Sequence, residues 1–186
     1  RGTQLERGSA FGVVRQLFES ALIRADEQTR KSLLRGAAGQ AAALLMPETR
    51  TSAVELDASL ATMHGLFWLT ANLCELKPVA LVVDDLHWCD VSSLRWLAYL
   101  TTRLEGLPVL LLSALRTGEP CADERLLDQL VTDPTVAVLR LAPLSVDGSA
   151  QLLRALIPGE VELGFVTACH DLTGGNPLLL RELAGV

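Results

Sequence analysis

The stretch Val79-Ala80-Leu81-Val82-Val83-Asp84-Asp85 decides the fold class of this chain. Five consecutive apolar residues, three of them β-branched, end abruptly at two acids. Such a short, continuous apolar run is typical of a strand that is buried on both faces of a parallel sheet. A second run of this kind covers residues 109–115 and ends at Arg116, and a third covers residues 136–141.

Helical patterns separate these apolar runs. The segment after Asp90 carries Leu94, Leu97 and Leu104 on one helical face, and either Asp90 or Ser92 can cap the start of that helix. Residues 123–131 have helical character as well. The alternation of strand and helix predicts an α/β fold in which right-handed crossovers join parallel strands.

Helices alone are expected on both sides of this α/β region. Before it, helical spacing of apolar residues covers residues 10–25, 28–46 and 57–76, and we place Trp68 and Trp96 in the core. After Pro143, helices are expected over residues 145–157, over 160–171 and from Asn176-Pro177 onward. We therefore expect a partial α/β core over residues 1–143 and a small helical subdomain over residues 144–186.

Composition limits the classes of function. The 186 residues include 16 basic and 22 acidic side chains, and the formal charge of −6 argues against a general nucleic-acid-binding surface. The four cysteines are scattered without metal-ligand spacing, which favours reduced thiols in the cytoplasm. No apolar run reaches the roughly 20 residues that a membrane-spanning helix needs, and the polar start does not resemble a signal peptide.

The ends of the first two predicted strands carry charge. Ligands of open parallel sheets bind at the carboxyl ends of strands, where Asp84, Asp85 and Arg116 are expected to lie. A carboxylate pair can share Mg²⁺ with a phosphate, or one acid can orient a water, while the arginine can contact the phosphate. The alternative is structural: a capping aspartate, a solvated aspartate and a surface arginine.

Residues 81–90 (LVVDDLHWCD) resemble the Walker B segment of signal-transduction (STAND-type) ATPases related to AAA+ proteins. In particular, they are similar to the ATPase domain of large LuxR-type bacterial transcriptional regulators. Four other segments are similar to the same family in the same order. They are residues 6–17 (the helix after its second strand), 112–116 (its sensor-1 strand with a terminal Arg), 141–145 (the entry to its helical lid) and 174–183 (its Gly-x-Pro lid motif).

The resemblance implies a three-layer parallel sheet of P-loop NTPase type followed by a helical lid, and a slow ATPase that works as an ATP/ADP switch. Asp84 would bind Mg²⁺, Asp85 would activate the attacking water and Arg116 would sense the γ-phosphate. The residues that would approach the adenine and ribose are Gly175, Asn176 and Pro177.

The sequence also departs from the family pattern. These ATPases hold phosphates with a Gly-rich loop that ends in Gly-Lys-Ser/Thr, and neither Lys31 nor Lys77, the two lysines of the chain, lies in such a loop. Measured against the family, the first strand, the P-loop and the DNA-binding helix-turn-helix are missing. We therefore expect a fragment with weak or no activity of its own, which either forms a homo-oligomer through its open sheet edges or has a rearranged sheet.

Two other functions fit the same residues. A degenerate ATPase fold can act as an interaction or oligomerisation scaffold without turnover. An unrelated α/β enzyme can use Asp84, Asp85 and His87 for metal-assisted hydrolysis. Beside them, Asp90 is expected to cap a helix rather than bind metal, and Cys89 is redox-sensitive only if its thiolate is stabilised.

Overall fold

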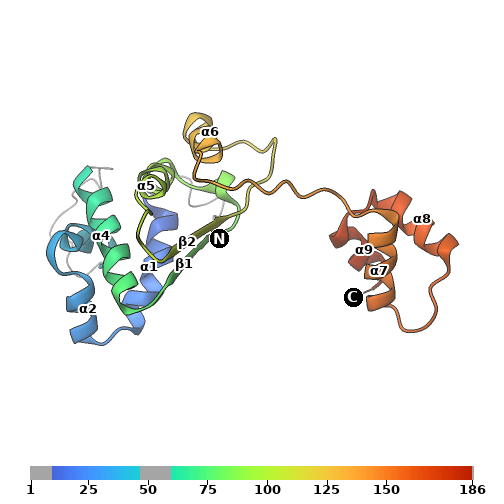
Figure 1. Cartoon of the computed structure of the whole chain (residues 1–186), viewed down its shortest axis with the longest axis horizontal. Coiled ribbons are helices and arrows are strands. Elements are labelled where there is room, and N and C mark those ends of the chain that lie inside the picture. Colours follow the sequence, from blue (N-terminus) through green and yellow to red (C-terminus); the bar gives the residue numbers. More distant parts are fainter. Residues whose placement is uncertain (1–9, 47–59, 186) are drawn as a thin grey trace. The chain divides into compact units, whose positions relative to one another are not determined.

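The computed structural model describes residues 10–46 and 60–185, and the chain divides into two compact units, Arg1–Ala137 and Val138–Val186. Each unit is built around its own cluster of buried apolar side chains. Figure 1 shows the helices and strands of each unit. No helix within the described ranges is long and apolar enough to cross a membrane.

The first unit begins with helices. They are α1 (Gly12–Arg24), α2 (Glu27–Leu33), the 3₁₀ helix η2 (Gly36–Ala41), α3 (Ala42–Leu45) and α4 (Leu60–Leu76). The predicted helices over 10–25 and 57–76 are confirmed where the structure describes them; residues 57–59, like residues 6–9 of the family-like segment, lie outside the described ranges. The helical character predicted over 28–46 is confirmed, but the segment is interrupted after α2, where Gly36 has φ of 62°, and it continues as η2 and α3.

Two parallel strands form the sheet. β1 (Val79–Val83) and β2 (Val109–Ser113) pair in register from Val79 opposite Val109 to Val83 opposite Ser113. The connection between them contains the short 3₁₀ helix η4 (Leu86–Trp88) and α5 (Val91–Thr101). Both strands were expected from their apolar runs, and the parallel βαβ unit is confirmed.

The sheet is buried on one face only. Leu81 and Val83 point into the helical layer and are buried, whereas Val82 on the other face is 56% exposed. Leu110 and Leu112 of β2 share that exposed face, at 60% and 53%. The expectation of strands buried on both faces is therefore wrong for the described residues, although the apolar sequence is that of a doubly buried strand.

The third predicted strand does not form. After α6 (Glu124–Thr132), residues 136–141 adopt no regular secondary structure, and Leu139 and Leu141 are 82% and 95% exposed. A strand is stable only when a neighbour accepts and donates its backbone hydrogen bonds. Within residues 10–46 and 60–185 the sheet contains β1 and β2 alone. The segment 136–141 has a composition typical of a strand, but it has no neighbouring strand with which to pair.

A buried carboxylate joins two helices of the first unit. Asp90 caps α5 by accepting from the backbone N–H of Ser93 at 2.9 Å and from its hydroxyl at 2.6 Å. The same carboxylate accepts from the backbone N–H groups of Phe11 at 2.9 Å and Val13 at 3.4 Å, at the start of α1. Asp90 is thus a helix cap, as expected, and it serves two helices at once.

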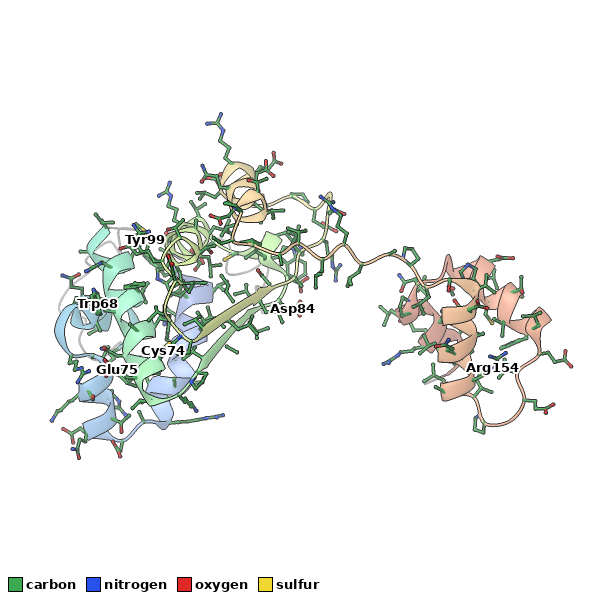
Figure 2. All side chains as sticks on the ribbon, in the orientation of Figure 1. Trp68, Cys74, Glu75, Asp84, Tyr99 and Arg154 are labelled. Atoms are coloured by element: carbon green, nitrogen blue, oxygen red, sulfur yellow. The ribbon has the colours of Figure 1, made fainter. Side chains whose placement is uncertain are left out.

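The two core tryptophan predictions have different outcomes. Trp96 is completely buried and packs edge-on against Phe18 of α1, with ring centroids 5.5 Å apart. Trp68 is 42% exposed, so its placement in the core is wrong. Its indole N–H donates to His64 one helical turn earlier, and this hydrogen bond at the surface of α4 keeps the polar edge of Trp68 out of the core (Figure 2).

The second unit consists of three short helices. They are α7 (Val146–Leu156), α8 (Leu163–Thr173) and α9 (Pro177–Leu183). Ser145 caps α7 and Asn176 caps α9, both through side-chain oxygens that accept backbone N–H groups. Leu153, Val166 and Leu180 fill the small core between the helices. The predicted helices exist, with α8 starting three residues later than expected.

Candidate functional site

The chain bulges where β1 ends at the two acids. The Ala114 N–H donates to the Val83 carbonyl at 3.0 Å, and the Leu86 N–H donates to the Ala114 carbonyl at 2.8 Å. A regular parallel ladder would use the N–H of Asp85 instead, so one extra residue is inserted and two aspartates oppose one alanine. Figure 2 labels Asp84 at this end of β1.

Asp85 takes the backbone conformation that the bulge requires. Its φ of 55° and ψ of 52° lie in the left-handed region, which aspartate tolerates better than most residues. Local hydrogen bonds hold it: the Asp85 N–H donates to Oδ1 of Asp84 at 3.1 Å, and its carbonyl accepts from the Trp88 N–H at 2.8 Å. The bulge therefore breaks the alternation that would send the two carboxylates to opposite faces.

Arg116 and Asp85 meet at the carboxyl ends of the two strands. Nε of Arg116 lies 3.7 Å from Oδ1 of Asp85, so the structure brings together two of the residues singled out by the sequence. The arginine side chain is 65% exposed, whereas that of Asp85 is 18% exposed. An ion pair with one partner in solvent is weak, worth about 0–1 kcal/mol, so Arg116 can turn toward another anion at little cost.

His87 lies beneath this ion pair. Its ring is completely buried; Nδ1 is 3.4 Å from the Arg116 N–H and Nε2 is 3.9 Å from Oδ1 of Asp85. Sequence reasoning included His87 only in the hydrolase hypothesis, and complete burial argues against contact with a solvent water. No local signal in the sequence indicates this burial, because it depends on the backbone hydrogen bond between Leu86 and the distant Ala114.

Cys89 next to this cluster is an unreactive thiol. The side chain is buried, and burial together with the nearby charge of Asp90 raises the pKa of Cys89 to about 12. Since the thiolate is the reactive form, the condition for redox sensitivity is not met.

The carboxylates of Asp84 and Asp85 suit a metal ion that is also bound by a phosphate better than a metal ion held by protein side chains alone. Within the described ranges, no group of three or more His, Cys, Asp or Glu side chains could hold a metal ion. Mg²⁺ is usually bound through one or two carboxylates together with phosphate oxygens and waters. The donor set of Asp84 and Asp85 thus fits a Mg²⁺ that a phosphate shares, and it disfavours a hydrolase that binds metal without nucleotide.

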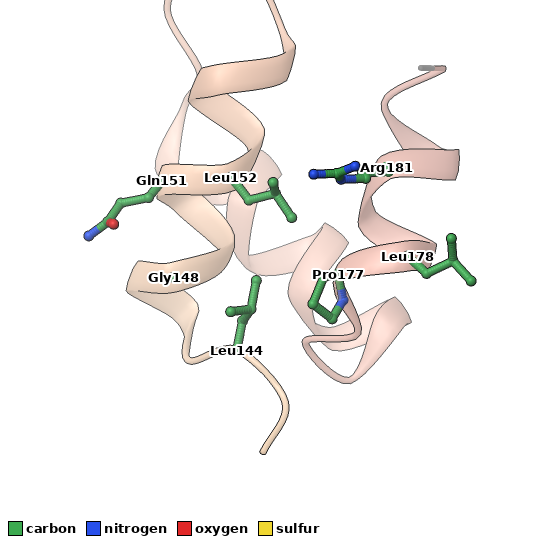
Figure 3. A pocket seen from close by; sticks show the side chains of 7 residues that line it. All are labelled: Leu144, Gly148, Gln151, Leu152, Pro177, Leu178 and Arg181. Carbon is green, nitrogen blue, oxygen red and sulfur yellow. The ribbon is translucent and has the colours of Figure 1, made fainter. Parts of the chain in front are cut away.

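The helical unit has a groove of its own beside Pro177. The groove has a volume of 620 Å³ and lies between α7 and α9. Figure 3 shows Leu144 and Leu152 pointing toward α9, where Pro177 and Arg181 face them. Such a surface, apolar with one cation, offers flat contact to an aromatic ring and charge to an anion. Arg181 was not singled out by the sequence.

The other two predicted lid residues, Gly175 and Asn176, stabilise the fold of the helical unit. Gly175 is buried with φ of 73°, and a Cβ there would lie 2.3 Å from the Leu144 carbonyl oxygen. Its own carbonyl accepts from the Leu144 N–H at 2.9 Å. Asn176 caps α9 by accepting from the N–H groups of Leu178 and Leu179. Gly175 and Asn176 therefore form the turn into α9, and Pro177 alone of the three lines the groove.

Comparison of the chain with protein-family models, with curated proteins and with solved structures yields no significant match.

Proposed function

We propose that this chain is part of the nucleotide-binding switch domain of a STAND-type ATPase in a cytoplasmic bacterial regulator of the large LuxR type. The observation that carries the proposal is the bulge at Asp84 and Asp85, which places Asp85 beside Arg116 at the carboxyl ends of two adjacent parallel strands. Ligands of parallel α/β sheets bind at this edge, and carboxylates with an arginine suit a magnesium-bound phosphate.

Each residue of the candidate site has its own role in the proposed function. Asp84 holds Mg²⁺, Asp85 orients the water that attacks the terminal phosphate, and Arg116 leaves its weak pairing with Asp85 to contact that phosphate. Pro177 in the groove of the helical unit contacts the base. Bound nucleotide then biases the helical lid against the α/β core, as expected of a two-state switch.

The proposed domain is larger than the part that this sequence supplies. No Gly-Lys-Ser/Thr loop occurs among the 186 residues, so the phosphate cradle of a P-loop NTPase has no counterpart here. We propose that β1 and β2 belong to a three-layer parallel sheet completed by further strands. The chain alone then binds nucleotide weakly and has little or no ATPase activity.

A titration with fluorescent ADP in Mg²⁺ buffer tests the nucleotide proposal. Saturable binding that is lost in Asp84→Ala, and kept in Asp128→Ala as a matched surface control on α6, supports the switch domain. Binding that is equal in wild type and Asp84→Ala contradicts the role of the carboxylate pair. If the folded chain does not bind ADP, nucleotide binding requires the phosphate loop that this sequence lacks. That result favours the second candidate function, a self-associating scaffold.

The second candidate is a scaffold that self-associates through its sheet, and a specific observation favours it. Within the described ranges one edge of β2 has no strand beside it, and Val82, Leu110 and Leu112 form an exposed apolar face. Open edges of this kind pair with other chains. Light scattering after gel filtration should then show a homo-oligomer that Leu112→Lys dissociates and Leu76→Lys, at an exposed end of α4, does not.

A further inference from the structure

We propose that the outer surface of α4 and α5 is a docking site for an acidic peptide segment of another protein. This aromatic patch consists of His64 and Trp68 of α4 together with Arg95, Tyr99 and Arg103, which lie on α5 or directly after it. It holds the one tyrosine and one of the three tryptophans of the chain. Figure 2 shows Trp68 and Tyr99 well away from Asp84 at the end of β1, so the aromatic patch is separate from the nucleotide site proposed above.

Hydrogen bonds hold the two rings of the aromatic patch in place. Nε2 of His64 accepts from the indole N–H of Trp68 at 2.8 Å, and Nδ1 of the same imidazole lies 3.3 Å from the Tyr99 hydroxyl. Because Trp68 and Tyr99 belong to different helices, His64 joins α4 to α5 at the surface. Phe67 packs edge-on against Trp68, with ring centroids 5.7 Å apart. A partner that binds here does not need to order these rings, which lowers the entropy cost of binding.

The aromatic patch is open to solvent although its side chains are ordered. Trp68 is exposed and Tyr99 is half-buried. The other three members, His64, Arg95 and Arg103, are exposed as well. Tryptophan, tyrosine and arginine are the residues that most often supply the binding energy of protein interfaces. Rigid aromatic rings flanked by arginines therefore have the composition of an interaction surface rather than that of a core.

The aromatic patch is cationic in an acidic chain. Residues 60–74 and 91–103 contain no Asp or Glu, although the whole chain has 22 acids and a net charge of −6. The Arg103 guanidinium lies over the ring of Tyr99, 3.7 Å from its centroid, and its Nη1 donates to the Tyr99 carbonyl at 2.9 Å. Arg95 precedes Tyr99 by one helical turn, on the same face of α5. The ion pairs among the described residues involve neither arginine, so both guanidinium groups can bind carboxylates of a partner.

An acidic peptide fits this surface better than a nucleic acid does. Single-stranded nucleic acids also stack on aromatic rings, but they need a track of cations along their phosphate backbone. The aromatic patch supplies two arginines, and a chain of net charge −6 repels a long polyanion. A peptide needs only carboxylates that reach Arg95 and Arg103, and an apolar side chain that packs on the indole of Trp68.

Selection from a displayed library of random peptides on the complete chain tests the proposal, because it does not require the natural partner to be known. We expect the enriched peptides to combine aspartate or glutamate with an apolar residue. Arg103→Gln should weaken the binding of an enriched peptide about tenfold, the loss expected for one hydrogen bond to a charged group. The control Arg154→Gln, which removes the same charge from an exposed position on α7 of the second unit, should leave the affinity unchanged.

NMR signals of the indole N–H groups locate the bound peptide. An enriched peptide should shift the signal of Trp68 and leave that of the completely buried Trp96 in place. Trp68→Ala should weaken binding about thirtyfold, as expected for a residue at the centre of an interface. If Trp68→Ala does not fold, Arg95→Gln at an exposed position decides, with the same tenfold loss expected as for Arg103→Gln.

Three results would overturn the proposal. The first is enrichment of no peptide, or of peptides without acidic residues, which contradicts the charge argument. The second is an acidic peptide that binds Arg95→Gln and Arg103→Gln as tightly as wild type, because such a peptide binds elsewhere on the chain. The third is oligothymidylate that shifts the Trp68 signal and binds more tightly than the enriched peptides, which would make the aromatic patch a nucleic-acid site.

Discussion

Removing the Asp90 carboxylate should strongly destabilise the first unit. Asp90 is 2% exposed and accepts three short hydrogen bonds, from Phe11 and twice from Ser93, besides a longer one from Val13. Asp90→Ala removes the cap of α5, which is worth about 1 kcal/mol, and leaves the buried Phe11 N–H unsatisfied at about 1–3 kcal/mol. Phe11 also loses the partner that holds its φ of 60°.

Together these losses predict a decrease of about 2–4 kcal/mol in the free energy of unfolding, a large part of the 5–15 kcal/mol typical of domains. Urea unfolding followed by tryptophan fluorescence measures this decrease. Trp96 of α5 packs on Phe18 of α1, so its fluorescence reports on the contact between the two helices that Asp90 joins. Asp90→Asn keeps one acceptor oxygen and should lose clearly less.

The result that refutes this reasoning is an Asp90→Ala variant within about 1 kcal/mol of wild type, the scale of a single cap. The α1–α5 contact would then be held by apolar packing alone. An equal loss in Asp90→Asn and Asp90→Ala would show that the second carboxylate oxygen, rather than the cap, carries the stability.

Three further predictions follow from local geometry. Gly65→Ala should destabilise the chain by about 1–3 kcal/mol in urea unfolding, although alanine favours helices, because the added Cβ would lie 2.7 Å from a backbone nitrogen of η2; a stabilised variant would contradict this. Cys89, with its pKa raised to about 12 by burial and Asp90, should resist a thiol reagent at pH 8 in the native state and react only on unfolding. Hydrogen bonds from Thr29 lower the pKa of Asp26, which caps α2. The stability that this cap gives α2 is therefore present above the unfolded-state pKa near 3.8 and is lost as the pH falls through the folded-state pKa. A carboxyl NMR titration of Asp26 that shows no downward shift of its pKa would disprove this prediction.

Much of the local structure could be predicted from the sequence. The apolar runs at 79–83 and 109–113 are strands because they suit neighbouring parallel strands, and the caps Asp90 and Asn176 mark helix starts within one residue. These signals depend on a few neighbouring residues, so they can be recognised without knowledge of the rest of the chain.

The candidate site could be predicted only as a list of residues. That Asp84, Asp85 and Arg116 follow strands is visible in the sequence, and parallel pairing implies that they lie at one edge. The bulge and the burial of His87 are not visible, since both depend on backbone hydrogen bonds between Leu86 and Ala114, residues far apart in the chain.

The sequence by itself determined the βαβ unit, the helix caps and the charged strand ends, because propensity, capping and apolar runs are local properties. Tertiary structure decided that residues 136–141 form no strand, that one sheet face stays exposed, and that Asp85 adopts a left-handed backbone above a buried imidazole. Strand pairing and burial are properties of contacts between distant segments, and a composition suited to them becomes structure only where a neighbour supplies the hydrogen bonds and the covering surface.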